Sequence, residues 1–294
     1  MKINFTRKQS FIIIAAIYVV AAAVGVATYQ FTAYMGLPWI RLLLADVAAT
    51  VVTFIFSLIF KNASVYDPYW SVQPMVIIVG FMIGQRFELL SFLILVTILF
   101  WGIRLTANWA YTFKSLAHED WRYRMLRKKT GGAYPLINFV GIHLVPTLVV
   151  YLCVLPAVKV VIRISGSVSP LENPLAYMAL LLSIGAALMQ GIADIQMHSF
   201  RKKGSGGFIR TGLWKNSRHP NYLGEILMWW GIGICSVSVL GWGYAFLLIG
   251  AVANTALFLF VSIPLAEGKQ AQKDGYDEYK AQTRALLPIS KKVK

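Results

Sequence analysis

The feature that most constrains this fold is a series of long apolar segments separated by short polar stretches. A helix needs roughly 20 residues to cross a bilayer, and it satisfies its own backbone hydrogen bonds in lipid. The third segment is short and contains Pro74. The sequence therefore predicts an all-α, polytopic membrane bundle of about eight transmembrane helices, or seven if the third does not cross. The expected spans are 10–33, 39–60, 70–85, 88–113, 135–158, 174–200, 222–240 and 242–265.

Composition and charge support this interpretation. Hydrophobic residues make up 57% of the chain and charged residues 14%, which excludes an ordinary soluble domain. With the N-terminus inside, 23 of the 28 Lys and Arg residues fall in inner segments and four in outer ones. This bias predicts that both termini are cytoplasmic. The net charge of +16 then reflects membrane topology and an anionic ligand, and no nucleic-acid partner is expected.

The stretch from Trp214 to Trp230 carries the clearest site pattern. It opens with polar and cationic residues that include Arg218 and His219, and Pro220 then stands where a helix would begin. Positive charge before a helix N-terminus favours an anion such as phosphate. A juxtamembrane basic loop would explain the cations equally well. It would not explain why Asn221 and Glu225 share one face of the following helix.

Two other segments, the fourth and the sixth spans, carry polar side chains at helical spacing, so that each set lies on one face of its helix. Arg104, Asn108 and Tyr111 lie on one face of the fourth span, and Asp67 lies between the second and third spans. With the predicted topology, these groups lie in the inner half of the membrane or at its inner surface. We expect them to meet at one inward-facing cavity, although buried pairs that only hold helices together remain an alternative. The stripe on the sixth span comprises Gln190, Asp194, His198 and Arg201.

Two loops add further candidates. The segment RKKGSGG, residues 201–207, places three cations, among them Lys202, before a flexible glycine turn that would suit phosphate. The loop from Lys114 to Tyr134 fits either an amphipathic helix on anionic lipid or a cap over the cavity. The four histidines show no metal-ligand spacing, so no metal is expected.

Several of these motifs resemble a known family. SRHPNYLGE in residues 217–225, with the Asp194 to Arg201 stripe, is similar to the C-terminal membrane domain of steroid 5-alpha-reductases and sterol reductases. YDPYWS, EDWRY and the terminal DGYDEY segment resemble the bacterial DUF1295 group of that superfamily. The resemblance divides the chain into an N-terminal transmembrane helix pair, residues 1–63, and a reductase-like membrane domain, residues 64–294. It also implies a bacterial inner membrane.

The resemblance implies an NADPH-dependent reductase acting on a carbon–carbon double bond of a lipophilic, steroid- or isoprenoid-like substrate that enters from the bilayer. The family's cofactor contacts correspond to Asp194, Arg201, Asn221 and Glu225, with Arg218 and Tyr222 beside them and Gln190 in place of an asparagine. From their position in the polar stripes and basic loops we add Arg104, His198, Lys202 and His219.

The sequence identifies the proton donor less directly than the cofactor contacts. Asp67 corresponds to a glutamate that holds the polar end of the substrate in the family. The family's donor tyrosine is replaced here by Trp101, which has no acidic proton to give. Tyr66, Tyr69, Tyr111 or a protonated Asp67 would have to act instead. We expect burial to raise the pKa of Asp67 and make it a usable acid.

Other functions remain open. The RHPxYxGE core is also similar to isoprenylcysteine carboxyl methyltransferases, so an S-adenosylmethionine-dependent methyltransferase of prenyl-cysteine or phospholipid is the alternative enzyme. The cations near residues 201–218 favour NADPH, because the methyl donor carries no phosphate. A membrane scaffold with a structural polar core is the non-enzymatic alternative. Substrate identity and oligomeric state do not follow from the sequence.

Overall fold

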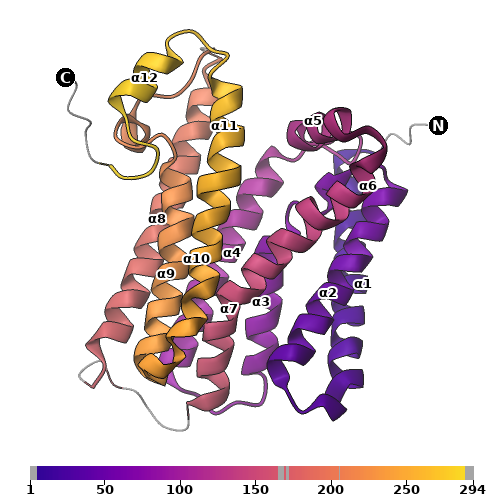
Figure 1. The fold of residues 1–294 in the computed structure, drawn as a ribbon, viewed down its shortest axis with the longest axis vertical. Helices are drawn as coiled ribbons and strands as arrows, with labels where there is room; N and C mark the ends of the chain where they lie inside the picture. Colours follow the sequence, from indigo (N-terminus) through magenta and orange to yellow (C-terminus); the bar gives the residue numbers. More distant parts are fainter. Residues whose placement is uncertain (1–4, 165–168, 170–171, 205, 289–294) are drawn as a thin grey trace. The chain divides into compact units, whose positions relative to one another are not determined.

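The computed structural model describes residues 5–164, 169, 172–204 and 206–288 and is almost entirely helical (Figure 1). These residues form no β-strand, and their only bridge of the β type joins Ser217 to Arg284. The predicted all-α class is confirmed. The helices are α1 Arg7–Phe31, α2 Pro38–Ile59, α3 Tyr69–Met82, α4 Leu89–Thr112, α5 Trp121–Thr130, α6 Tyr134–Ile137, α7 Val145–Arg163, α8 Pro174–Lys202, α9 Pro220–Leu240, α10 Ile249–Leu257, α11 Ile263–Gln270 and α12 Tyr276–Gln282.

Seven helical segments in the described part of the chain are long and apolar enough to cross a membrane. They agree with the expected spans except the third, because α3 has 14 residues and is too short. Two spans combine several elements. Trp121–Arg163 joins α5 to α7 through the π-helical turn η4, Asn138–Leu144, and Trp242–Gln270 joins α10 and α11 through a second π-helical turn, η7, Phe258–Ser262.

The chain divides into two compact units. Unit 1 comprises residues 1–83 and 102–155, and unit 2 comprises residues 84–101 and 156–294. Helices α4 and α7 each contribute residues to both units. The boundary expected at residues 63 and 64 followed a family resemblance rather than compactness, and it stays a prediction.

In unit 1, α1 packs along α2 (Figure 1). Helix α1 begins with a capping box, in which the Thr6 side chain accepts from the backbone of Gln9 and the Gln9 side chain accepts from the backbone of Thr6. Gly25 faces α2, because a Cβ there would lie 3.4 Å from the Ala45 carbonyl oxygen, at ordinary van der Waals contact. Most of the outward face of α1 is apolar and exposed, as expected for a helix in lipid.

In unit 2, α8 and α9 lie side by side over much of their length, with α10 next to α9 (Figure 1). Helix α9 begins at Pro220, as the sequence predicts, and it ends before Gly241, whose φ of 94° is unfavourable for other residues. Helices α11 and α12 then carry the chain back toward the segment that connects α8 to α9 (Figure 1).

Candidate functional site

The close packing of α8 on α9 depends on two glycines of α9. A Cβ on Gly224 would lie 2.5 Å from the Gln190 side chain and 2.6 Å from the Ala186 carbonyl oxygen. A Cβ on Gly231 would lie 2.5 Å from the Ala179 carbonyl oxygen. Any side chain at these positions would push the helices apart. Small residues at a helix interface allow this kind of close approach in membrane proteins.

Glu225 lies at this interface and is the most completely enclosed carboxyl of the predicted site. It is 3% exposed and accepts three hydrogen bonds. Its Oε2 accepts from Gln190 Nε2 of α8 at 2.6 Å and from Trp101 Nε1 of α4 at 2.8 Å. Its Oε1 accepts from Trp229 Nε1 at 2.9 Å. These N–H donors stabilise a carboxylate that would otherwise be costly to bury.

One turn nearer the start of α9, Asn221 contacts Asp194 across the same interface. Asn221 Nδ2 lies 3.5 Å from Asp194 Oδ1, at the long limit for a hydrogen bond. Both side chains are half-buried, in contrast to Glu225. Tyr222 stacks on His219, with ring centroids 5.1 Å apart and planes at 4°. The predicted Gln190, Asp194, Asn221 and Glu225 thus meet in two polar pairs.

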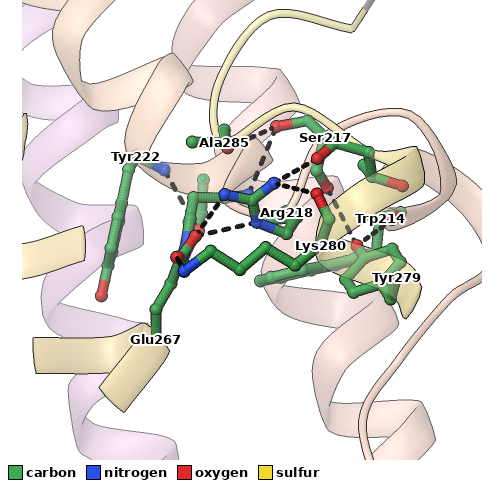
Figure 2. Close-up of polar contacts among 11 residues, drawn as sticks. Trp214, Ser217, Arg218, Tyr222, Glu267, Tyr279, Lys280 and Ala285 are labelled. Carbon is green, nitrogen blue, oxygen red and sulfur yellow. Dashed lines mark hydrogen bonds and ion pairs between the residues drawn. The ribbon is translucent and has the colours of Figure 1, made fainter. Parts of the chain in front are cut away.

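Arg218 is held in an ion pair that the sequence pattern did not indicate. Its guanidinium is buried, with Nη2 2.6 Å and Nε 2.8 Å from Glu267 Oε1 of α11 (Figure 2). The Lys280 ammonium lies 2.9 Å from the other oxygen, Glu267 Oε2. Arg218 Nη1 also donates to the backbone carbonyls of Thr283 and Lys280. His219 Nε2 completes the cluster, 3.3 Å from Glu267 Oε1.

The C-terminal tail is joined to the segment before α9 by backbone bonds as well. The Arg218 N–H donates to the Arg284 carbonyl and the His219 N–H to the Ala285 carbonyl, both at 3.0 Å. The Tyr279 hydroxyl donates to the Trp214 carbonyl (Figure 2). Burial raises the pKa of Tyr279 to about 12, so its hydroxyl keeps the proton that it donates. Arg218 therefore anchors the tail in this structure.

Exposed cations follow the polar pairs at the C-terminal end of α8. Arg201, Lys202 and Lys203 are all exposed, and the half-buried His198 lies one turn before Arg201. Cations in the last turn of a helix also meet the negative end of its dipole, which is a sufficient structural reason for them. Their charge is nevertheless accessible to an anionic ligand, whereas that of Arg218 is enclosed by the tail.

In unit 1, Asp67 accepts a hydrogen bond from the Tyr123 hydroxyl at 2.5 Å. Burial raises the pKa of Asp67 to about 6, although the positive charge of Arg122 and the bond from Tyr123 act against this rise. The direction agrees with the expectation from the sequence. A carboxyl with this pKa changes its charge close to neutral pH and is therefore suited to proton transfer.

The candidate tyrosines lie in different environments. Tyr66 and Tyr69 are buried, with the Tyr66 hydroxyl 2.8 Å from Thr147 Oγ1 and the Tyr69 hydroxyl 3.0 Å from Asp46 Oδ1. Tyr111, by contrast, is 54% exposed at the end of α4. Arg104 is half-buried on the part of α4 that belongs to unit 1, whereas Asp194 and Glu225 belong to unit 2. The single cavity expected for all these groups stays a prediction.

Three partners in the site were missed from sequence. The sequence indicates only that Trp101 is a poor acid, but its indole N–H donates a hydrogen bond to the buried Glu225 carboxylate. Trp229 stands four residues after Glu225, a spacing that could have indicated their contact. Glu267 is the only acidic residue of α11 and lies near the end of an apolar span, where a buried charge requires a partner.

The family described as "Protein of unknown function (DUF1295)" matches residues 53–283. A Schizosaccharomyces pombe protein, described as uncharacterized, is 26% identical over 218 residues, covering 62% of this chain and 61% of that protein. The match thus spans less than two thirds of the yeast protein. No solved structure matches the chain. Because the family match covers most of the sequence and both polar pairs of α8 and α9, this chain belongs to the DUF1295 family.

Proposed function

We propose that the protein is a membrane-embedded reductase that uses NADPH to reduce a carbon–carbon double bond in a lipophilic substrate. The supporting observation is the row of groups along α8 and α9. The pairs Gln190–Glu225 and Asp194–Asn221 lead to exposed cations at the end of α8. The residues of this row carry the resemblance to the steroid 5-alpha-reductase superfamily. The seven apolar helical segments are consistent with a substrate that enters from lipid.

The charged and polar side chains of this row fit the phosphate, ribose and amide groups of NADPH. Arg201, Lys202 and Lys203 offer exposed positive charge for the phosphates, and Asp194 with Asn221 offers half-buried groups for ribose hydroxyls or an amide. In this proposal Arg218 anchors the C-terminal tail and does not bind phosphate, because Glu267 already neutralises its positive charge. S-adenosylmethionine, the cofactor of the alternative methyltransferase, carries no phosphate for the cations to bind.

NADPH would supply a hydride for one carbon of the double bond. The second carbon gains a proton, so the chain must hold an acid. Asp67 is the acid that the sequence predicts for this role, and burial raises its pKa to about 6, so a fraction of it is protonated near neutral pH. After it gives up its proton, the Asp67 carboxylate is stabilised by the Tyr123 hydroxyl and by the positive charge of Arg122. Apolar helices would keep water away from the reacting carbons.

The test uses NADPH that carries deuterium at its transferable position. The purified protein in detergent is incubated with steroid and isoprenoid enones, and products are analysed by mass spectrometry. The proposal predicts oxidation of NADPH together with one deuterium in the reduced product. Asp67→Asn should retain NADPH binding and lose most turnover. Absence of turnover with every enone, together with absence of NADPH binding, would contradict the proposal.

A further inference from the structure

One buried polar stripe lies outside the proposed cofactor site. On α2 of unit 1, Asp46, Thr50, Thr53 and Ser57 follow at intervals of four, three and four residues, so they share one face. Each is at most 5% exposed. An ionisable group inside a transmembrane segment is expensive and is commonly functional. The stripe therefore needs an explanation beyond helix packing.

The stripe connects to hydroxyl groups of two other segments. Asp46 accepts from the Tyr69 hydroxyl at 3.0 Å and from Gln73 Nε2. The Thr50 side chain also acts electrostatically on the Tyr69 hydroxyl. Thr50 Oγ1 lies 3.0 Å from Thr147 Oγ1 of α7, which in turn lies 2.8 Å from the Tyr66 hydroxyl. Hydrogen-bonded hydroxyls thus lead from Tyr66 through Thr147 to Thr50, and the neighbouring Tyr69 hydroxyl donates to Asp46.

None of the partners of Asp46 in the described structure is a cation. Its hydrogen bonds come from a neutral phenol and a neutral amide, and the titratable groups that act on it or are influenced by it are Tyr66, Tyr69 and Tyr151. A lone carboxylate in a low-dielectric interior is strongly unfavourable, whereas a neutral acid is not. The surroundings of Asp46 therefore favour a carboxyl group that carries its proton.

Two nearby side chains have buried polar atoms that no described residue satisfies. Gln73 Oε1 is one, and His143 Nε2 is the other. Unpaired buried polar atoms commonly mark ordered water. His143 packs on Tyr66, with ring centroids 4.7 Å apart, and it lies in the π-helical turn η4, a distortion frequent at functional sites. Tyr66, at the far end of the hydroxyl chain, therefore lies beside an unsatisfied donor or acceptor.

We propose that Asp46 is an exchangeable proton store, which holds one proton as a neutral acid and exchanges it with water through the hydroxyls of Tyr69, Thr50, Thr147 and Tyr66. Each exchange breaks one O–H bond and forms another along the chain, so no oxidant or reductant is needed. The store does not depend on the proposed reductase. Reduction of an alkene consumes one proton with each hydride, and such a store would suit that reaction.

Infrared spectroscopy of the protein in detergent tests the store directly. A protonated carboxyl has a distinct carbonyl band, which shifts when deuterium from D₂O replaces its proton. We expect this band near neutral pH in the wild type, its loss in Asp46→Asn, and a changed position in Asp46→Glu. Absence of an Asp46-dependent band near neutral pH would overturn the proposal, and Asp46→Glu preserves the test if Asp46→Asn does not fold.

Deuterium exchange then tests the path. The double variant Thr50→Val/Thr147→Val should slow the band shift by about tenfold, because it interrupts the hydroxyl chain. Thr97→Val is the matched control, since Thr97 is equally buried and its hydroxyl donates only to the Leu93 carbonyl of its own helix. Equal exchange rates in all three proteins would refute the path. NADPH binding is measured separately, so failure of the store and failure of the reductase proposal can be distinguished.

Discussion

At the scale of single residues, Glu225 shows how one carboxylate joins three helices. Its two oxygens accept N–H groups from Gln190, Trp101 and Trp229. Removal of the carboxylate would leave these three buried N–H groups without their hydrogen-bond acceptor. Glu225 is therefore a structural centre first, whatever ligand binds nearby, and a loss of binding in its variants would not by itself identify a cofactor contact.

We predict that Glu225→Ala lowers the unfolding free energy of the detergent-solubilised protein by about 3 kcal/mol, the scale of one to three unsatisfied buried polar groups. Thermal unfolding followed by tryptophan fluorescence measures the change. The matched control is Glu278→Ala, because Glu278 is exposed on α12. Equal stability of the two variants would show that the three hydrogen bonds contribute little.

Asp67 should give a pH dependence with a definite sign. Its pKa rises from 3.8 to about 6 in the folded protein, so the folded state binds the proton more tightly than the unfolded state. The stabilisation from this proton is complete below pH 3.8 and is lost as the pH rises through about 6. Melting temperatures across this range should fall more steeply in the wild type than in Asp67→Asn. The same slope in both proteins would contradict the pKa shift.

At the scale of elements, the contact between α8 and α9 depends on the absence of side chains. We predict that Gly224→Ala destabilises the protein by about 2 kcal/mol, because the added Cβ would lie 2.6 Å from the Ala186 carbonyl oxygen. Gly185→Ala on α8 serves as control, since a Cβ there has no atom within 4 Å. The control should keep or raise the melting temperature in detergent. Equal changes in melting temperature for the two variants would show that helix propensity, and not close packing, determines the effect of the substitution.

The ion pair of Arg218 and Glu267 holds the C-terminal tail in place, and proteolysis can test this role. Glu267→Gln removes the charge that Arg218 and Lys280 share, and it should loosen the tail beyond α11. Limited proteolysis should then cut between residues 271 and 288 several times faster than in the wild type. Glu278→Gln on α12 is the control, because no ion pair in the described structure involves it. Unchanged cleavage in Glu267→Gln would mean that the backbone bonds hold the tail alone.

At the scale of the whole molecule, the sequence predicts the fold class, nearly all spans and the start of α9 at Pro220. These features depend on local patterns, namely apolar length, proline position and helical spacing. The four-residue spacing within each pair also predicts that Gln190 shares a helix face with Asp194, and Asn221 with Glu225. It could not show that Trp101 would reach Glu225, or that Arg218 would meet Glu267, because those contacts join residues 124 and 49 positions apart. Charge alone could not distinguish the exposed Arg201 from the enclosed Arg218.

The central claim is that the row along α8 and α9 binds NADPH, and calorimetry on the purified protein in detergent tests it most directly. The account predicts that NADPH binds, that S-adenosylmethionine does not, and that Arg201→Gln weakens NADPH binding by about tenfold through loss of one charge-assisted contact. Arg86→Gln, at an exposed loop position, should bind NADPH as the wild type does. Binding of S-adenosylmethionine in place of NADPH, or equal NADPH affinity in the two variants, would contradict it.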